Sequence, residues 1–516
     1  MAMSRGRVAL SGIGLWLLAT IVASGLAQDK PIVATAPLAG TSLKAPESQV
    51  AGLTGCAARG CHGGPIRSDA GPVPAGVKNA CSIWLQHDRH YHAYRVLYSE
   101  LSEKMIRHLA GGKPAPPAYQ DSRCLACHTT PTLAEVAATP EVRRLRREGV
   151  SCDACHTSPG MATSDWYFPH QRGDRPGGLD DCYEHLGMRW LGDTRSRAAV
   201  CVGCHVGAPA DPEHGIPRRE VNHDLIAAGH PRLNFEYTTY LALMPPHWSD
   251  ARDEKSRLAA SAAPGTEVLD WYLGQLASHS AGLRLLADQA SRTEGTWPEL
   301  AALQCYSCHF NFLKNPRPGE GPTWRQKAAS AWKNPHGQAA WSQLSIPRPI
   351  RAWLSRNKEW RKHWTELERL MACPRPPANQ VAKIARTLAE QIDQMAAQLS
   401  QSLHKPTAAL ELIQELQEQW NSQPLPTWDE VAQIYYALQA VNQSRHRLRS
   451  RKSDAPDSID QQLQHLAEAL RLPRKPTVIN SPVDYDPEHV SPPMRLLMQS
   501  IIAWYRDQGF PESPSR

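Results

Sequence analysis

The chain has 516 residues, a length that favours two or three domains over one ordinary core. Only 5 residues are Phe, whereas 43 are Pro and 22 are His, so the side chains supply little of the large apolar surface on which a conventional core is built. The net charge of +7 comes from scattered Lys and Arg without an aromatic-interleaved basic stripe. This distribution argues against nucleic acid as a partner.

Residues 1–27 have the pattern of a secretory signal. Arg5 and Arg7 precede an apolar stretch over residues 8–18, and a small-residue site ends at Ala27. We therefore expect cleavage after Ala27 and a periplasmic or otherwise exported protein. The alternative is an uncleaved helix over residues 8–26, because about 19 apolar residues can just span a bilayer and would tether the chain to the membrane. Residues 28–50, rich in Pro, Ala and Ser, are expected to form a flexible tether.

Ten of the 13 cysteines fall into five pairs, and a histidine follows the second cysteine of each pair. Four pairs have the spacing CxxCH: Cys124, Cys127 and His128; Cys152, Cys155 and His156; Cys201, Cys204 and His205; Cys305, Cys308 and His309. This spacing is typical of haem c, since the two thiols form thioethers with the haem vinyl groups and the histidine binds iron. Zinc knuckles give no reason for the histidines, and disulfides within CxxC pairs would close small, strained rings.

The fifth pair, Cys56 and Cys61 with His62, has four residues between its thiols. The wider loop can still reach both vinyl groups if it bulges, and Gly60 supplies backbone freedom next to Cys61. A local disulfide or an empty site is the alternative. We therefore expect five haems c, and four at minimum. We assign no function to the three remaining cysteines, which are Cys81, Cys182 and Cys373.

Several segments around these motifs resemble the cytochrome c-554 family of multihaem electron carriers, whose haem arrangement is related to that of the hydroxylamine oxidoreductase group. They are Trp84 with residues 88–94, residues 149–156 with His170 downstream, and residues 222–233, which resemble larger relatives. The resemblance covers roughly residues 50–340 and implies a mainly helical fold with closely stacked haem pairs. The widened first site, the additional motif and the long C-terminal extension depart from the family's pattern of four CxxCH sites.

Each motif histidine leaves one further axial position on its iron. Twelve other histidines lie between residues 80 and 340: His87, His90, His92, His108, His170, His185, His214, His223, His230, His247, His279 and His336. From these we predict the distal ligands His90, His170, His223, His230 and His336. The last choice is open among His336, His185, His214 and His247.

Helical spacing adds two geometric expectations for these ligands. A helix over residues 82–109 would place His87 and His90 on one face. The seven-residue separation of His223 and His230 corresponds to two helical turns, and would place them on one face about 10 Å apart.

The fold class expected is mainly α, with a multihaem cytochrome c domain over residues 51–345 whose core is packed with haem and holds little sheet. Residues 346–516 are expected to form a helical C-terminal domain. A stripe at helical spacing supports it: Val381, Ile384, Leu388, Ile392, Met395 and Leu399. Further helices are predicted over residues 408–420, 429–448, 458–470 and 493–505. The histidines predicted to lie on its surface are His404, His446, His465 and His489.

These observations predict a periplasmic multihaem c-type cytochrome that transfers electrons between redox partner proteins through bis-histidine haems. The alternative is a multihaem oxidoreductase that acts on a small nitrogen or sulfur compound at a five-coordinate haem, although no CxxCK motif is present. A haem-based sensor is a third possibility. The C-terminal domain is interpreted as a structural buttress, with a docking surface for a redox partner or a lid over one haem as alternatives.

Overall fold

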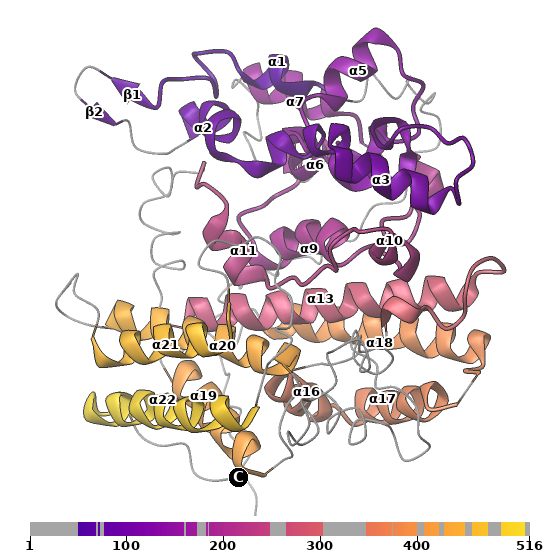
Figure 1. Cartoon of the computed structure of the whole chain (residues 1–516). Helices are drawn as coiled ribbons and strands as arrows, with labels where there is room; N and C mark the ends of the chain where they lie inside the picture. Colours follow the sequence, from indigo (N-terminus) through magenta and orange to yellow (C-terminus); the bar gives the residue numbers. More distant parts are fainter. Residues whose placement is uncertain are drawn as a thin grey trace, which may run out of the picture. The chain divides into compact units, whose positions relative to one another are not determined.

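The computed structural model describes most of the chain from residue 50 onward. The described residues are 50–68, 71–72, 77–158, 161–172, 182–183, 185–247, 265–302, 347–373, 375–399, 407–422, 428–448, 457–472 and 487–510. They are mainly helical, as expected (Figure 1). Their sheet has two short antiparallel strands, β1 (Arg67–Ser68) and β2 (Gly71–Pro72), with Arg67 opposite Pro72.

Residues 50–247 form short helices joined by turns. The α-helices are α1 (Gly52–Cys56), α2 (Ala80–His87), α3 (Glu100–Leu109), α4 (Ser122–His128), α5 (Pro140–Arg146), α6 (Cys152–His156), α7 (Thr163–Arg172), α9 (Thr194–His205), α10 (His223–Ala227) and α11 (Tyr237–Leu243). The 3-10 helices are η2 (Val77–Asn79), η3 (Arg89–His92), η4 (Arg95–Tyr98), η5 (Ala118–Gln120), η6 (Pro131–Leu133) and η7 (Pro212–His214).

The single helix predicted over residues 82–109 is wrong. α2 ends at His87 because Asp88 takes an extended backbone, and the Asp88 side chain accepts the backbone N–H of His90 to start η3. Ser99 then caps α3 through the N–H of Ser102. His87 and His90 therefore lie on different elements and share no helix face.

The expectation that His223 and His230 lie two turns apart on one helix is also wrong. α10 begins at His223 and ends at Ala227, and Gly229 follows with a φ of 117°, which an L side chain rarely adopts. His230 therefore lies beyond the end of the helix. The chain turns at this glycine, so the separation of the two imidazoles cannot be derived from helical rise.

Apolar packing within residues 50–247 is divided among small clusters. One surrounds Leu125, a second surrounds Val202, and a third joins Leu133 and Leu145. By contrast, a single large cluster unites α13 with the C-terminal helices. The N-terminal part thus lacks a continuous core of apolar side chains among its described residues, which fits the predicted packing around haem.

The long helix α13 and the C-terminal helices share the large core, and the short 3-10 helix η9 follows α13 in the sequence. Their bounds are α13 (Thr266–Ser291), η9 (Leu300–Ala302), α16 (Arg348–Ser355), α17 (Lys358–Met371), α18 (Ala378–Leu399), α19 (Ala408–Ser422), α20 (Trp428–Leu448), α21 (Ser458–Ala469) and α22 (Pro487–Asp507). α13 packs most extensively against α18, and it also contacts α9, α11 and α20 (Figure 1). This one long helix therefore connects the bundle to the motif-bearing α9.

The predicted apolar stripe of residues 381–399 is confirmed. Val381, Leu388, Ile392 and Leu399 are buried in the core, and the two other members pack against it. The four later helices are also present. α22 starts at Pro487, six residues earlier than predicted, and contains Pro492 and Pro493 in its interior.

Three of the C-terminal histidines predicted to lie on the surface are exposed, namely His446, His465 and His489. His404 lies outside the described residues.

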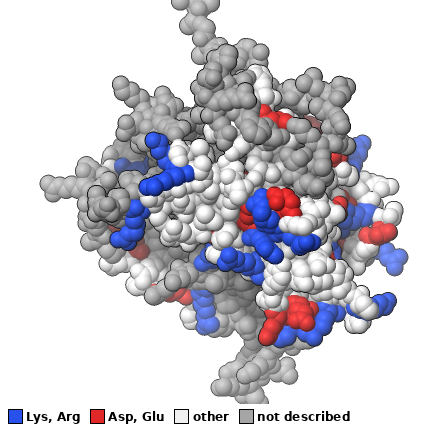
Figure 2. Space-filling model, turned by 90° about the horizontal axis from the view of Figure 1, so that it is seen from above, with Lys and Arg blue, Asp and Glu red and all other residues white. Residues whose placement is uncertain are grey.

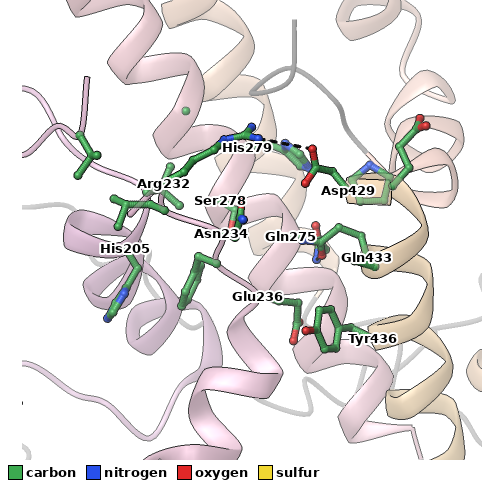
Figure 3. Close-up of a pocket in the computed structure, with 18 of the residues that line it drawn as sticks. His205, Arg232, Asn234, Glu236, Gln275, Ser278, His279, Asp429, Gln433 and Tyr436 are labelled. Atoms are coloured by element: carbon green, nitrogen blue, oxygen red, sulfur yellow. Dashed lines mark hydrogen bonds and ion pairs between the residues drawn. The ribbon is translucent and has the colours of Figure 1, made fainter. Parts of the chain in front are cut away.

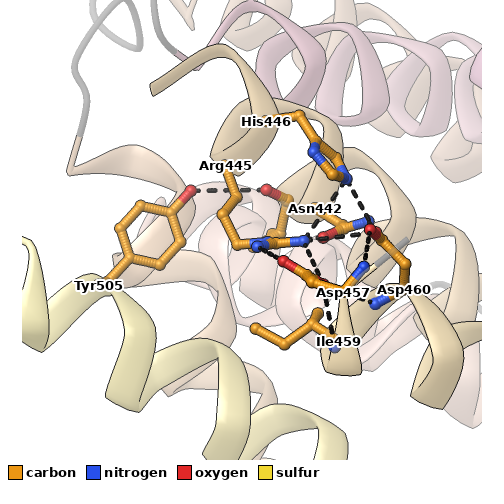
Figure 4. Close-up of polar contacts among 8 residues, drawn as sticks. Asn442, Arg445, His446, Asp457, Ile459, Asp460 and Tyr505 are labelled. Carbon is orange, nitrogen blue, oxygen red and sulfur yellow. Dashed lines mark hydrogen bonds and ion pairs between the residues drawn. The ribbon is translucent and has the colours of Figure 1, made fainter. Parts of the chain in front are cut away.

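A buried charge network joins α20 to the start of α21 (Figure 4). The side chain of Arg445 is 0% exposed; its Nη1 donates to Asp457 at 2.6 Å and its Nε to Asn442 at 2.7 Å. Its guanidinium also lies 5.5 Å from the ring centroid of Trp504 on α22. Burial raises the pKa of Asp460, but hydrogen bonds from Asn442 and His446 outweigh this effect and lower the pKa to about 2.

On the face shown in Figure 2, Asp and Glu lie beside Lys and Arg in several clusters, with uncharged surface between the clusters. Within the described part of the chain, no helix combines the length and the apolar character needed to cross a membrane.

Substituting Arg445 with Ala is expected to lower the free energy of unfolding by about 3–5 kcal/mol, because two carboxylates lose their buried cation. Arg351 is the matched control, since its ion pair with Glu368 is exposed and its replacement with Ala should cost about 1 kcal/mol or less. Urea unfolding followed by far-ultraviolet circular dichroism measures both. Equal midpoints for the two variants would contradict a stabilising role for the network.

Candidate functional site

The three described CxxCH motifs share one local structure. Each occupies the end of an α-helix whose last residue is the motif histidine: His128 ends α4, His156 ends α6 and His205 ends α9. Because residues three apart lie on the same side of a helix, both thiols of a motif face one side. The histidine one position later is then held beside them. The helical turn thus provides the geometry that attachment of one planar macrocycle requires.

The Cys56–Cys61 motif is built differently. Helix α1 ends at Cys56, and a turn closed by the backbone hydrogen bond from Cys61 to Ala58 carries the chain to His62. The two additional residues of this motif therefore lie in a turn between the two cysteines. The backbone N–H of Cys81 donates to the carbonyl of His62 at 2.9 Å, which fixes the residue after the bulge.

Two of the motif histidines face another histidine ring. The imidazoles of His62 and His170 have centroids 6.0 Å apart and are nearly parallel, with an interplanar angle of 4°. The imidazoles of His205 and His90 have centroids 6.1 Å apart at an angle of 74°. His62 and His205 belong to attachment motifs, whereas His170 and His90 are distal ligands predicted from the sequence.

These separations have a specific meaning. An imidazole nitrogen binds a metal ion at about 2.0 Å, so two imidazoles on opposite sides of one iron have centroids roughly 6 Å apart. Rings that stack in direct contact can have centroids as close as about 4.5 Å. The spacing in both pairs therefore matches the gap that one iron and its porphyrin fill.

The two remaining described motif histidines are also close to other histidines. Burial lowers the pKa of His156 to about 3, and among neighbouring charges His247 has the largest effect. Burial likewise lowers the pKa of His128, with a further contribution from His230. His247 is therefore within electrostatic range of the third motif, as are His62 and His170, and His230 is within range of the second.

Hydrogen bonds orient several of these rings through Nδ1. The Nδ1 of His128 donates to the carbonyl of Ala93 at 2.8 Å, and that of His230 donates to the carbonyl of Pro231 at 2.8 Å. In His90 the acceptor is a buried carboxylate, Asp88, at 2.9 Å. A proton on Nδ1 leaves the lone pair on Nε2, which is the tautomer that an axial ligand requires.

Thiols of different motifs lie next to each other. The side chain of Cys127 hydrogen-bonds that of Cys204, and the side chain of Cys152 hydrogen-bonds that of Cys56. Cys155 is close enough to Cys201 and Cys204 for their charges to raise its pKa further, after the larger effect of burial. The four described motifs therefore form one continuous series of neighbours: first, third, fourth and second.

A buried aspartate inside the third motif holds the first motif in place. Asp153 is 4% exposed and accepts the backbone N–H groups of Ala51 and Gly52 at 3.0 and 3.1 Å. It also accepts the hydroxyl of Thr163 on α7 at 2.6 Å. On the same helix, the hydroxyl of Tyr167 donates to the carbonyl of Gly55. These contacts tie α1, α6 and α7 together and so bring His170 to His62.

Comparison with known families matches residues 51–157 to the family described as cytochrome c554 and c-prime. The matched segment contains the first three motifs, together with His90 and Asp88. This segment belongs to the cytochrome c554 family. The protein is accordingly a c-type cytochrome of electron transfer, with haem c as its cofactor. No curated protein and no solved structure matches the chain.

The other predicted site residues of this cytochrome either begin α10 or lie outside the described residues. His223 begins α10, where its backbone N–H donates to the carboxylate of Glu299 at 2.9 Å. The fifth motif, with Cys305, Cys308 and His309, lies outside the described residues, as does His336. His247, only an alternative in the sequence, lies near His156. Nothing in its local sequence distinguishes it from its neighbours, since the contact joins residues 91 positions apart.

Gly149, which precedes the third motif, offers a test of how this segment positions His90, the residue that faces His205. A Cβ at Gly149 would lie 2.2 Å from the carbonyl oxygen of His90, and its φ is +68°. Gly111 has a similar φ of +58° but open space around it. We expect Gly111→Ala to cost about 1 kcal/mol from backbone strain alone, whereas Gly149→Ala should also displace His90.

Thermal unfolding and the low-spin haem spectrum of the two variants measure this difference. Equal losses in both variants would show that the contact between Gly149 and the His90 backbone does not matter for the site.

Proposed function

We propose that this protein is a periplasmic multihaem electron carrier whose irons are held by pairs of histidines and pass electrons between redox partner proteins. The observation that carries the proposal is two pairs of facing imidazoles, His62 with His170 and His205 with His90. The spacing of each pair suits one iron. An iron with two protein ligands keeps no open position for a substrate, so its chemistry is electron transfer.

The proposed axial ligands follow from proximity. The haem at Cys56 and Cys61 takes His62 and His170, and the haem at Cys201 and Cys204 takes His205 and His90. By the electrostatic contacts described above, the haem at Cys124 and Cys127 takes His128 and His230. The haem at Cys152 and Cys155 takes His156 and His247. With the motif at Cys305 and Cys308, the proposal is five haems c.

The order of the thiols supports a route for electrons. Cys56 contacts Cys152, Cys155 is close to the fourth motif, and Cys204 contacts Cys127. Haems attached at these thiols would have neighbouring edges. Electrons would pass along the first, third, fourth and second haems in that order. This order differs from the order of the motifs in the sequence.

Two partly buried arginines lie along the middle of this route. The Nη1 of Arg189 donates to the carbonyl of Cys155 at 3.1 Å, and Arg219 hydrogen-bonds the sulfur of Cys204. Burial lowers the pKa of Arg189, and the charge of Arg219 lowers it further, after a countering effect of Cys155. A fixed positive charge favours the reduced iron, so these residues support higher potentials at the third and fourth haems.

Export is part of the proposal because haem attachment of this kind takes place after secretion. The pattern of Arg5, Arg7 and the apolar stretch that follows supports it. The uncleaved form of the same segment would hold the carrier at the membrane surface. Fractionation of cells that express the full chain, with mass determination of the mature N-terminus, distinguishes the two forms.

The haem count tests the proposed cofactor content directly. Pyridine haemochrome quantitation and intact mass of protein matured in a strain competent for cytochrome assembly should give five haems per chain. The ferrous protein should also bind little carbon monoxide, because each iron is six-coordinate. Stoichiometric binding of carbon monoxide with turnover of a nitrogen or sulfur compound would contradict the carrier and favour an enzyme.

His90 and His92 provide a matched pair for the ligand assignment. His90→Ala should convert one low-spin iron to high-spin, since it removes the imidazole that faces His205. His92→Ala should leave every iron low-spin, because His92 is exposed on the same short 3-10 helix and faces none of the four described motif histidines. Electron paramagnetic resonance of the two holoproteins measures this, and identical spectra would refute the assignment.

Replacing Asp88 with Asn should raise the reduction potential of the haem at Cys201 and Cys204. A carboxylate that accepts the Nδ1 proton makes the imidazole a stronger donor and favours ferric iron, whereas a neutral amide does so less. Asp211→Asn is the control, because Asp211 makes the same bond to His214 at 2.7 Å and His214 is not among the axial ligands proposed above. Spectropotentiometric titration should show a rise in the first variant only.

A further inference from the structure

The ring of His205 is held by aromatic packing rather than by a hydrogen bond. His128 and His90 each donate Nδ1 to an acceptor, whereas the ring of His205 makes no hydrogen bond within the described part of the chain. One face of this imidazole instead stacks on the ring of Phe235, with centroids 5.3 Å apart and an interplanar angle of 14°. The ring of Tyr240 meets it at 68°, with centroids 4.9 Å apart.

Phe235 and Tyr240 form the hydrophobic staple at the start of α11. Glu236 is 1% exposed and caps this helix by accepting the backbone N–H groups of Thr238 and Thr239 at 3.1 and 2.7 Å. Phe235 precedes the cap, Tyr240 follows it by four positions, and their ring centroids lie 4.8 Å apart. The local sequence therefore fixes these two rings relative to each other and to the helix.

A cavity of about 160 Å³ beside His205 shows why these ring contacts matter (Figure 3). His205 and Phe235 line it, together with Gln275 from α13 and Tyr436 from α20. On the side of the cavity, few side-chain atoms are close enough to oppose a rotation of the imidazole. The orientation of this ring therefore depends on Phe235 and Tyr240.

The angle between facing rings differs between the two histidine pairs. It is 74° for His205 with His90 and 4° for His62 with His170. Two imidazoles on opposite sides of one iron both contain the iron–nitrogen axis, so this angle is also the angle between the ligand planes. Parallel rings donate electrons into the same iron orbital and stabilise ferric iron, whereas crossed rings divide this donation between two orbitals. Crossed ligand planes therefore favour ferrous iron.

We propose that Phe235 and Tyr240 are positioning residues that hold the imidazole of His205 across that of His90 and thereby raise the potential of the fourth haem. The inference rests on the proposed function, since it requires that these two histidines share one iron. It also gives the C-terminal bundle a role in the site. The long helix α13 packs against both α9, which ends at His205, and α11, which carries Tyr240.

Electron paramagnetic resonance of the full-length ferric holoprotein tests the ligand planes. Crossed planes leave two iron orbitals nearly equal in energy and give a strongly anisotropic low-spin signal, whereas parallel planes give a rhombic one. The wild type should show both types of signal. His90→Ala should remove one equivalent of the anisotropic signal and leave the rhombic signals in place. Loss of a rhombic signal in this variant, or a wild type with rhombic signals alone, would overturn the proposal.

The role of the aromatic rings is tested with Phe235→Leu and Tyr240→Leu. The matched control is Tyr240→Phe, which keeps the ring and loses only the hydroxyl that donates to the carbonyl of Asn234 at 3.2 Å. Each Leu variant should keep the wild-type haem count, convert one equivalent of the anisotropic signal to a rhombic signal, and lower the potential of one haem. The control should leave both the spectrum and the potentials unchanged.

Leu variants with the full haem count, an unchanged anisotropic signal and unchanged potentials would contradict the positioning role. Loss of a haem from both Leu variants would also contradict it, because the aromatic rings would then serve assembly of the site and not the angle between its ligands. Failure of the proposed function is distinguishable, because it would appear in the wild type as missing haem mass or as high-spin iron.

Discussion

The constraint on which the structure depends is the distance between the imidazoles of two histidine pairs, each of which contains one motif histidine. Centroid separations of 6.0 Å for His62 with His170 and 6.1 Å for His205 with His90 leave room for a metal ion between the rings and little else. Each pair joins a motif to a residue far away in the chain. The polypeptide must therefore fold so that distant loops meet across a plane, and the short helices of residues 50–247 serve that requirement.

Polar contacts, more than apolar packing, hold those loops in this arrangement. Asp153 binds the start of α1 and Thr163 of α7, while Asp88 both caps η3 and orients the ring of His90. A buried carboxylate is costly unless it accepts hydrogen bonds, so such contacts favour one geometry of the loops. The apolar clusters in this part are small, and the large core lies around α13, which links the bundle to α9.

Much of the site was predictable because the residues of each motif are close together in the sequence. A CxxCH motif places two thiols and an imidazole within one helical turn, and the three described examples lie at helix ends as that geometry requires. The apolar stripe of α18 was equally local. Predictions based on helical spacing over longer stretches were wrong at Asp88 and Gly229, where one side-chain cap and one positive φ ended the helices. Neither the pattern of apolar and polar residues nor the spacing of the histidines reveals that a single residue ends a helix.

The sequence by itself determined the haem c cofactor and the helical class, and it predicts the attachment residues, because each depends on neighbours a few positions apart. Only the tertiary structure decided which distal histidine faces which motif, and that the neighbouring motifs run first, third, fourth and second. His247 meets His156 across 91 residues, and Cys204 meets Cys127 across 77. Those meetings depend on turns and on buried hydrogen bonds between distant segments. No local sequence pattern predicts these contacts, because they form only when distant segments come together in the folded chain.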